Sequence, residues 1–360
     1  MRVSDVALFR WLPQLAARVP WVRLGEWPTP VDAIELDGRP LWIKREGDSS
    51  PRYGGNKVRT LEAWLGHAQA MGARRIWAMG AYGSNHAIAT VLHARAIGLD
   101  AAAILFPQPH SAWAIENAGA LVATGCELVR LRHVVEVPLA GLAVARRDRR
   151  SIVMPPGGAT PIGTFGAVSA ALELAEQIAD GLAPAPRRIV LPIGSTCTTA
   201  GLVAGLVLAH ALGAWRWAVP VVHAVRVTPW PVTSRVRTAE LAARTLGRIA
   251  ELGGPRVAIG IGELVARLVV DGSELGAGYG RATPASVAAT AELGASSRAP
   301  RLDGVYSAKA AAALLRLHRR HVGPLLFWST KSTPQLAPPS LDSLRHAPRT
   351  LRHWLRDGVH

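Results

Sequence analysis

Short apolar runs alternate with helix-like runs along most of the 360-residue chain. RIWAMG (75–80) and DAAAILF (100–106) are short and apolar and are followed by Gly or Pro signals, which is typical of buried strands. The runs that come after them, 87–98 and 111–125, have helical periodicity, and each ends at a glycine. Strands that alternate with helices build a parallel sheet with crossover helices. The order of elements therefore predicts an α/β fold.

The same alternation resumes after a Gly/Pro-rich hinge, MPPGGATPIG (154–163). The other expected strands lie at 127–131, 187–193, 220–227 and 323–329, and further helices are expected at 164–180 and 234–252, with another after residue 201. A chain of this length exceeds the needs of one minimal core. We therefore expect two domains, or one large α/β unit with a smaller lobe.

Composition excludes several classes of protein. Apolar residues make up 49% of the chain and charged residues 18%, so the chain is globular rather than disordered. Two cysteines, Cys126 and Cys197, cannot form a disulfide framework and fit a reducing compartment, so we expect a cytoplasmic location. The first 24 residues lack the apolar core of a signal peptide. The most apolar segment, 198–215, carries His210 and many Ala and Gly residues, which favours a buried helix over a membrane span.

The formal charge of +16 raises the question of a nucleic-acid partner. The positive charge is spread along the chain, and we find no zinc-ligand spacing, recognition-helix pattern or alternation of aromatic and basic residues. Arginine takes the place of lysine almost throughout, which indicates a compositional bias. We therefore expect no nucleic-acid partner and no metal site.

Only four of the 41 basic residues are lysines: Lys44, Lys57, Lys309 and Lys331. Lys57 ends the motif GGNK (54–57), at the start of a helix-like run. Glycines allow a flat ligand to approach the backbone, and a lysine at a helix start can have a lowered pKa and a nucleophilic amine. A surface turn with a solvated lysine is the alternative for this motif taken alone.

The motif GSTCTTAG (194–201) follows the expected strand 187–193 and precedes a helix. Backbone N–H groups at a helix start bind phosphate, and hydroxyl side chains can add donors; Ser195, Thr196, Thr198 and Thr199 supply them. The motif lacks the GK[ST] order of a Walker loop and the G-x-G-x-x-G order of a dinucleotide site. An ordinary strand–helix turn remains the alternative.

The motif GSNH (83–86) also lies between a strand and a helix. It places Ser84, Asn85 and His86 at a helix N-terminus, which suits an anionic group such as a carboxylate. The alternative is that Ser84 or Asn85 only caps the helix. A candidate amine nucleophile, a phosphate loop and a carboxylate pocket are together the parts that hold pyridoxal phosphate and an amino acid.

The sequence resembles the fold-type II pyridoxal-phosphate enzymes of the 1-aminocyclopropane-1-carboxylate (ACC) deaminase and D-cysteine desulfhydrase family, from about residue 22 to 336. The matching blocks are IKREGD (43–48) with GGNKVRTLE (54–62), GSNH (83–86), PPGGATPIGTFGAV (155–168), LPIGSTCTTAGLVAGL (191–206), GAGYGRATP (276–284), LDGVYSAKAAAAL (302–314) and GPLLFWSTKSTPQL (323–336).

This resemblance implies the tryptophan synthase β-like fold, in which two open, twisted, mostly parallel sheets form three-layer αβα domains. The large domain would comprise 1–60 and 160–345, and the small domain 61–159. Residues 346–360 would form a C-terminal tail. Family members are commonly dimers, so a homodimer is implied.

The resemblance also implies how the cofactor pyridoxal 5′-phosphate is held. Lys57 would form the Schiff base and shuttle the proton, and Asn85 would hydrogen-bond the phenolic oxygen. Thr330 would partner the pyridine nitrogen. The phosphate would bind the loop Gly194, Ser195, Thr196, Cys197, Thr198 and Thr199.

For the substrate, the resemblance implies that Ser84, Asn85 and His86 bind the carboxylate, together with Gly158. Ser84 also counts among the expected catalytic residues. Tyr279 and Tyr306 match the two active-site tyrosines of the family, one near the ring and one placed for acid–base or nucleophilic work. Without the resemblance, each tyrosine is better explained by packing.

The chain departs from the family pattern in the phosphate loop, after Thr330, and at Ser329 and Gly83, where histidine and a polar residue are common. Thr196 and Cys197 stand where the phosphate loop usually has glycine or another small residue, and a side chain at Cys197 is expected to crowd a close approach of the backbone. Lys331 and Ser332 stand where glycines usually follow Thr330. These departures predict a substrate that differs from the usual ones.

The resemblance implies a lyase or deaminase that acts on a small amino acid and releases a 2-oxo acid and ammonia, with sulfide when the leaving group is a thiol. A hydroxyl at Thr330 cannot hold the pyridinium charge as a carboxylate does, which favours elimination over reactions that need a long-lived carbanion. Three alternatives stay open: ring opening as in ACC deaminase, β-replacement or racemisation of a specialised substrate, and a cofactor-binding paralogue without turnover.

Overall fold

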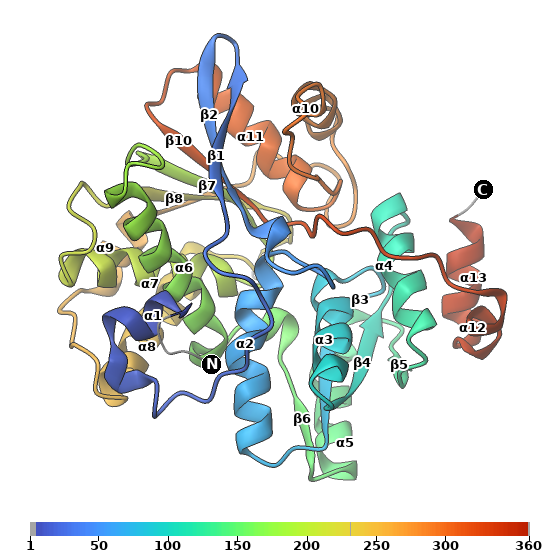
Figure 1. Cartoon of the computed structure of the whole chain (residues 1–360). Helices are drawn as coiled ribbons and strands as arrows, with labels where there is room; N and C mark the ends of the chain where they lie inside the picture. The colour runs from blue at the N-terminus through green and yellow to red at the C-terminus, as the bar shows by residue number, and fades with distance from the viewer. Residues whose placement is uncertain (1–4, 231, 359–360) are drawn as a thin grey trace.

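Two helix-flanked sheets organise the chain in the computed structural model, which describes residues 5–230 and 232–358 (Figure 1). In spatial order, the large sheet contains β1 (Val31–Leu36), β2 (Arg39–Arg45), β10 (Leu325–Ser329), β7 (Arg188–Ile193), β8 (Val221–Arg226) and β9 (Leu268–Asp271). The small sheet contains β5 (Leu128–Arg130), β4 (Asp100–Phe106), β3 (Arg75–Ala81) and β6 (Ser151–Val153). Apart from β1 with β2, all pairs in both sheets are parallel. The expected α/β fold with two mostly parallel sheets is confirmed.

Helices cover both faces of the large sheet. One face packs against α1 (Ala7–Trp11), α6 (Pro161–Ala179), α7 (Cys197–Ala211) and α8 (Arg235–Glu251), and the other against α10 (Pro284–Gly294) and α11 (Ser307–Arg319). Strand β10 is apolar throughout because both of its faces are buried. Leu326 and Trp328 enter the first core, whereas Leu325 and Phe327 enter the second. Successive side chains point to opposite faces, so a strand buried on both sides loses the polar alternation.

Helices cover both faces of the small sheet as well. One face packs against α2 (Asn56–Ala70), α3 (Asn85–Ala96) and α4 (Ala112–Ala123), and the other against α5 (Val137–Arg147). The remaining helices are α9 (Ile261–Ala266), α12 (Leu341–His346) and α13 (Arg349–Asp357), with short 3₁₀ turns at Pro13–Leu15, Glu46–Asp48, Val134–Glu136 and Pro156–Gly158. Leu351 and Leu355 of α13 lie in the same core as β3 and β4, so the C-terminal helices pack beside α4. The domain boundaries given above stay a prediction.

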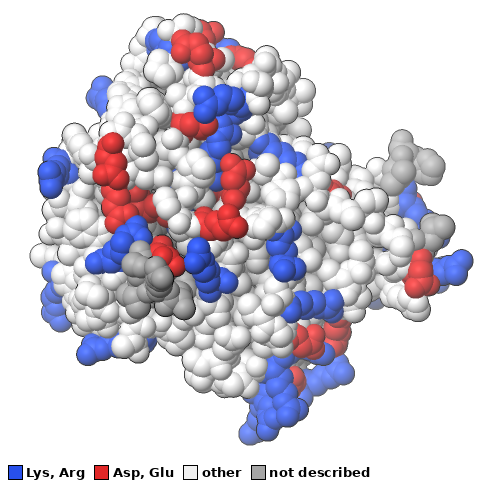
Figure 2. Space-filling model, in the orientation of Figure 1, with Lys and Arg blue, Asp and Glu red and all other residues white. Residues whose placement is uncertain are grey.

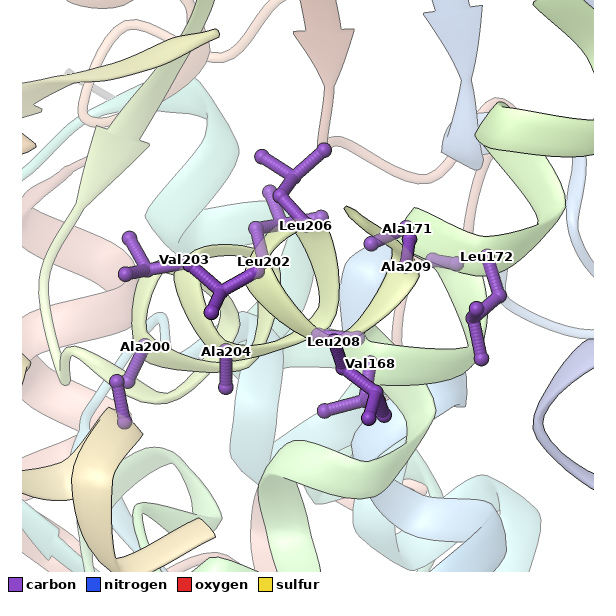
Figure 3. Close-up of a cluster of buried hydrophobic side chains, with 14 of the residues drawn as sticks. Val168, Ala171, Leu172, Ala200, Leu202, Val203, Ala204, Leu206, Leu208 and Ala209 are labelled. Atoms are coloured by element: carbon purple, nitrogen blue, oxygen red, sulfur yellow. The ribbon is translucent and has the colours of Figure 1, made fainter. Parts of the chain in front are cut away.

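Helices α6 and α7 pack closely, and this contact fixes the start of α7 (Figure 3). A β-carbon on Gly205 would lie 2.7 Å from Ala171 Cβ and 2.8 Å from Val168 Cα, so glycine is what permits the approach. Valine, leucine and alanine side chains of both helices fill the surrounding core. Gly201, nearer the start of α7, approaches α6 in the same way, because a β-carbon there would lie 2.6 Å from Ala167 Cβ. The N-terminal part of α7 is therefore held against α6.

The predicted strands agree with the structure within two residues at each end, but four strands were missed. β6 and β9 are edge strands of three and four residues. β1 and β2 form a hairpin around Asp37 and Gly38, whose φ angles are 51° and 69°. An Asp-Gly pair between apolar runs is a strong hairpin signal, so ELDGRPL could have revealed them.

Charged side chains of both signs are interspersed over the face seen in Figure 2. Within the described residues, no helix is long and apolar enough to cross a membrane. The apolar segment that begins at residue 198 forms most of α7, whose first thirteen residues are all buried in the large core.

Candidate active site

Lys57 lies in the first turn of α2, which stands between the two sheets (Figure 1). Gly55, just before the helix, has a φ of 94°, and a β-carbon there would lie 2.5 Å from the carbonyl oxygen of Thr330. The side-chain amide of Asn56 donates to Thr198 Oγ1 at 2.8 Å. The start of α2 thus joins two of the predicted cofactor segments, the one that opens α7 and the one after β10.

The amine of Lys57 is buried near His86 and Cys197. Burial lowers the pKa of Lys57, and the nearby thiol opposes this shift. Burial, together with the charge of Lys57, holds the pKa of His86 well below its ordinary value. Both ring nitrogens of His86 are buried and have no hydrogen-bond partner among the described residues. A buried imidazole without partners is costly, which indicates a place for a ligand.

A buried cluster of charges holds the opposite side of α2. Arg59 binds Glu46 and Glu173 at 2.8 Å each, and Lys44 also pairs with Glu173. The pairing with Arg59 and Lys44 lowers the pKa of Glu173 to about 2, against the effect of burial. Two positive and two negative charges balance within this cluster, so α2 is fixed to α6 and to β2.

The predicted phosphate loop runs from the end of β7 to the start of α7, and Thr196 is its most strained residue. Thr196 has a φ of 70° and a ψ of −21°, a left-handed conformation that a β-branched side chain rarely adopts. The carbonyl of Gly194 accepts hydrogen bonds from Thr228 and Thr233, which fixes the loop from outside. Thr198 and Thr199 lie buried in the first turn of α7.

Cys197 fills a space inside the protein. Its thiol lies 3.4 Å from the carbonyl oxygen of Gly158 and 3.8 Å from Thr60 Oγ1, and 1% of the residue is exposed. Burial raises the pKa of this thiol. The side chain of Cys197 thus packs between the first turn of α7 and the turn at residues 156–158, and the expected crowding of the phosphate loop stays a prediction.

The two glycines of that turn serve different contacts. Gly157 has a φ of 67°, and a β-carbon there would lie 1.9 Å from Ser195 Oγ and 3.6 Å from Lys57 Nζ. Gly157 therefore lets three segments meet at the lysine, and the sequence motifs did not single it out. The carbonyl of Gly158, a predicted substrate residue, accepts hydrogen bonds from Trp64 Nε1 and from the backbone of Thr160.

The GSNH motif forms the start of α3. Ser84 is the N-cap, and its hydroxyl accepts the backbone N–H of Ala87 at 3.2 Å. Asn85 Oδ1 accepts hydrogen bonds from the Tyr53 hydroxyl at 2.7 Å and from the Asn117 amide at 2.8 Å. Its oxygen is thereby occupied, and the NH₂ group of Asn85 is the part left to donate to a ligand.

Tyr279 and Tyr306 form a pair whose hydroxyl oxygens lie 2.9 Å apart. Burial raises the pKa of Tyr279 to about 12, and burial next to Tyr279 raises the pKa of Tyr306 well above its ordinary value. Both are therefore protonated at neutral pH. Tyr306 also packs on the phosphate loop, because a β-carbon on Gly194 would lie 3.0 Å from its ring.

A cavity joins Asn85 to the tyrosine pair. It is lined by Gly83, Asn85, Gln108, Trp113, Ala114, Asn117, Tyr279, Asp303, Val305 and Tyr306. The sequence motifs did not include Trp113 and Asn117, which lie one turn apart near the start of α4. The signal was a large aromatic and an amide spaced by four residues, which places them on one face of a helix rich in alanine.

The structure brings the predicted residues into two adjoining groups. The first group is Lys57 with the residues near it, His86, Ser195 and Cys197. In the second group, Asn85 and the tyrosines line the cavity. Tyr306 contacts Gly194 and so links the two groups. Within the described residues, no group of three or more His, Cys, Asp or Glu side chains could hold a metal ion. A desolvated amine, an imidazole without partners and a helix start rich in hydroxyls fit pyridoxal phosphate with an amino acid.

Comparison with known proteins agrees with this fit. The family described as "Pyridoxal-phosphate dependent enzyme" matches residues 22–324. Nocardicin C-9′ epimerase of Nocardia uniformis subsp. tsuyamanensis is 36% identical over 88% of this chain and 93% of its own. D-cysteine desulfhydrase of Salmonella paratyphi C is 30% identical over 89% of this chain and 96% of its own.

A crystal structure of an ACC deaminase homologue superposes with a TM-score of 0.72 at 28% identity, and the match covers 91% of this chain and 95% of the other. This likeness agrees with the fold-type II architecture that the sequence predicted. The chain thus belongs to the family of pyridoxal-phosphate dependent enzymes, within the fold-type II group that includes ACC deaminases and D-cysteine desulfhydrases.

Proposed function

We propose that this protein is a lyase that removes the α-proton of a small amino acid and eliminates its β-substituent, which yields a 2-oxo acid and ammonia. A thiol substituent would leave as sulfide, the chemistry that the name of one 30% identical relative describes. The observation that carries the proposal is a desolvated amine, Lys57, in one site with a hydrogen-bonded pair of protonated tyrosines.

Bound pyridoxal phosphate supplies the electron sink that makes the α-proton of an amino acid acidic. Lys57 would hold the cofactor and then take the α-proton, because burial lowers the pKa of its amine and keeps more of it neutral. The start of α7 would bind the phosphate through backbone N–H groups and the hydroxyls of Ser195 and Thr198. Thr330 would offer the pyridine nitrogen a neutral partner, which favours prompt loss of a leaving group.

The start of α3 would bind the substrate carboxylate. His86 is uncharged at neutral pH because burial depresses its pKa, so one of its ring nitrogens carries a proton that it can donate. Ser84 stands at the helix N-terminus, where backbone N–H groups favour an anion. Together they would orient the α-carbon toward Lys57.

The tyrosine pair would act as an acid. Because both pKa values are raised, Tyr279 and Tyr306 carry their protons at neutral pH and can donate one to a departing β-substituent. Their mutual hydrogen bond orients the donor. A thiolate needs little such help, whereas a hydroxyl leaving group depends on it.

Epimerisation of an amino-acid centre is the second candidate, and one observation favours it. The 36% identical relative is an epimerase, and the match spans nearly the whole of both chains. With a substrate that lacks a β-leaving group, a tyrosine could return a proton to the α-carbon after Lys57 has removed one. The two candidates share the removal of the α-proton and differ in the second step, which is either loss of a leaving group or return of a proton.

A substrate panel separates the two candidates. The holoenzyme is incubated with D- and L-amino acids, among them both cysteines, both serines and ACC. Release of 2-oxo acid and ammonia, with sulfide from cysteine, is the expected result. Inversion of configuration with solvent deuterium at the α-carbon and no 2-oxo acid would instead establish the epimerase. Spectral changes without any product would indicate a binding paralogue.

A further inference from the structure

Lys331 is a buried lysine whose ammonium has only neutral partners among the described residues. The residue is 1% exposed. Its Nζ lies 3.3 Å from Asn85 Oδ1, 3.4 Å from the Tyr53 hydroxyl and 3.5 Å from Asn117 Oδ1. The rings of Tyr53 and Trp113 lie 5.4 and 5.5 Å away, within the range of cation–π contacts.

This environment is unusual for a structural lysine. A buried charge is ordinarily paired, since an uncompensated ion is costly to desolvate. Burial lowers the pKa of Lys331, whereas Asp303 and Glu116 oppose that shift from a distance and Arg301 adds to it. Among the described residues no carboxylate forms an ion pair with this ammonium, so a negatively charged ligand nearby would supply the counter-charge that its neutral partners lack.

Asn85 is the partner that connects Lys331 to the active site. Lys331, Tyr53 and Asn117 all donate to the same oxygen, Asn85 Oδ1. Three donors fix the amide with its oxygen toward the protein and its NH₂ group free to donate elsewhere. Asn85 lines the cavity, so its NH₂ group is available to a ligand there.

We propose that Lys331 is a positioning residue that holds Asn85 as a hydrogen-bond donor and places a positive charge behind it, which stabilises negative charge on the cofactor's phenolic oxygen. This inference rests on the proposed function and on the role toward that oxygen that the family resemblance implies for Asn85. Because a positive charge disfavours a second one nearby, Lys331 would also lower the pKa at which the link between Lys57 and the bound cofactor loses its proton. An arginine at position 331 would change the shape of the side chain but keep its charge.

The other groups that could affect this proton lie on different elements. His86 and Cys197 face Lys57 from α3 and α7. Tyr53 faces Lys331, and burial raises its pKa so far that it stays neutral. Asp303 and Glu116 carry the negative charges nearest to the lysine and Arg301 a positive one. A substitution at position 331 leaves all of these residues in the chain. A shift of the spectral midpoint in such a variant is therefore attributed to Lys331.

The test is a pH titration of the visible absorbance of the holoenzyme. Lys331→Met removes the charge and keeps the length of the side chain, Lys331→Arg keeps the charge, and Tyr53→Phe removes one neutral donor to Asn85. We expect the spectral midpoint to rise by about one pH unit in Lys331→Met. In Lys331→Arg and Tyr53→Phe it should move much less. In kinetics with an active substrate, Lys331→Met should lower kcat more than it raises KM.

Three results would overturn the inference. Lys331→Met could retain colour and titrate like the wild type, or Lys331→Arg could shift as far as Lys331→Met, which would mean that the side chain only fills space. A wild type that binds no pyridoxal phosphate would overturn the proposed function as well, so the two failures are distinguishable. If Lys331→Met does not fold, Lys331→Gln replaces it, because glutamine keeps a neutral donor, and it should give the same upward shift.

Discussion

On one side of helix α2 the buried charged groups all have partners, whereas on the other side a buried polar group lacks one among the described residues. Arg59 belongs to a cluster in which every charge has a partner, with Lys44, Glu46 and Glu173. Lys57, two residues earlier and about 200° around the helix, lies near His86, whose ring has no partner among the described residues. Charges that are fully paired hold the scaffold, whereas groups without partners are available for a ligand. The cluster thereby fixes the helix that carries Lys57.

The largest effect is expected on turnover, from a substitution of Lys57. In Lys57→Ala, turnover should fall by roughly 10³-fold or more, as loss of a nucleophile does in other enzymes. The yellow colour of the bound cofactor should also disappear. The free energy of unfolding, from denaturant titration, should hardly change, because Lys57 forms no ion pair with the residues that the structure describes. Lys57→Arg is the control: it keeps the charge, yet it should be equally colourless.

On the side of α2 that carries Arg59, a substitution should instead reduce the free energy of unfolding. Glu173→Ala removes the partner of two buried cations and should lower the free energy of unfolding by about 3–5 kcal/mol. Glu176→Ala is a matched control on the same helix, since its ion pair with Arg10 is partly exposed and should contribute about 1 kcal/mol or less. Equal losses in the two variants would contradict the comparison.

Acid should weaken the charge cluster around Arg59. The folded pKa of Glu173 is about 2 and its ordinary value is 4.5. Because the folded value is the lower one, ionised Glu173 stabilises the fold above pH 4.5, and this stabilisation is lost as the pH falls toward 2. Unfolding at a series of pH values should show this loss in the wild type. A variant without Glu173 should have a flatter profile between those limits.

The smallest expected effect concerns the phosphate loop. Thr196→Gly relieves a left-handed backbone but makes the unfolded chain more flexible, so the free energy of unfolding should rise by up to about 1 kcal/mol. Pyridoxal phosphate should bind at least as tightly, measured by equilibrium dialysis. Weaker binding would mean that the Thr196 side chain itself contacts the cofactor.

Much of the fold could be predicted from local sequence. Strands such as DAAAILF (100–106) are apolar because both faces are covered, and the helix expected at 111–125 is α4, with Ser111 as its N-cap. β1 and β2 were missed although Asp37 and Gly38 mark their turn. β6 and β9 are too short and too near the sheet edges to show a pattern.

The sequence motifs predicted which residues belong to the candidate site, but not which contacts these residues make. The motifs placed Lys57, Ser84 and His86 at helix starts, and the structure agrees. No local pattern indicates that Cys197 would pack against Gly158, or that Lys331 would reach Asn85, 246 residues away in the chain. Such contacts arise from how the two sheets pack together, which sequence spacing does not encode.

The scarcity of lysine gives a direct test of the central claim, that Lys57 holds pyridoxal phosphate. The holoenzyme is reduced with borohydride, which makes the link between cofactor and lysine permanent, and its peptides are examined by mass spectrometry. With only four lysines in the chain, every candidate can be assigned. We expect one pyridoxyl group per chain, on Lys57. A label on Lys44, Lys309 or Lys331 instead, or no label on a protein saturated with pyridoxal phosphate, would contradict it.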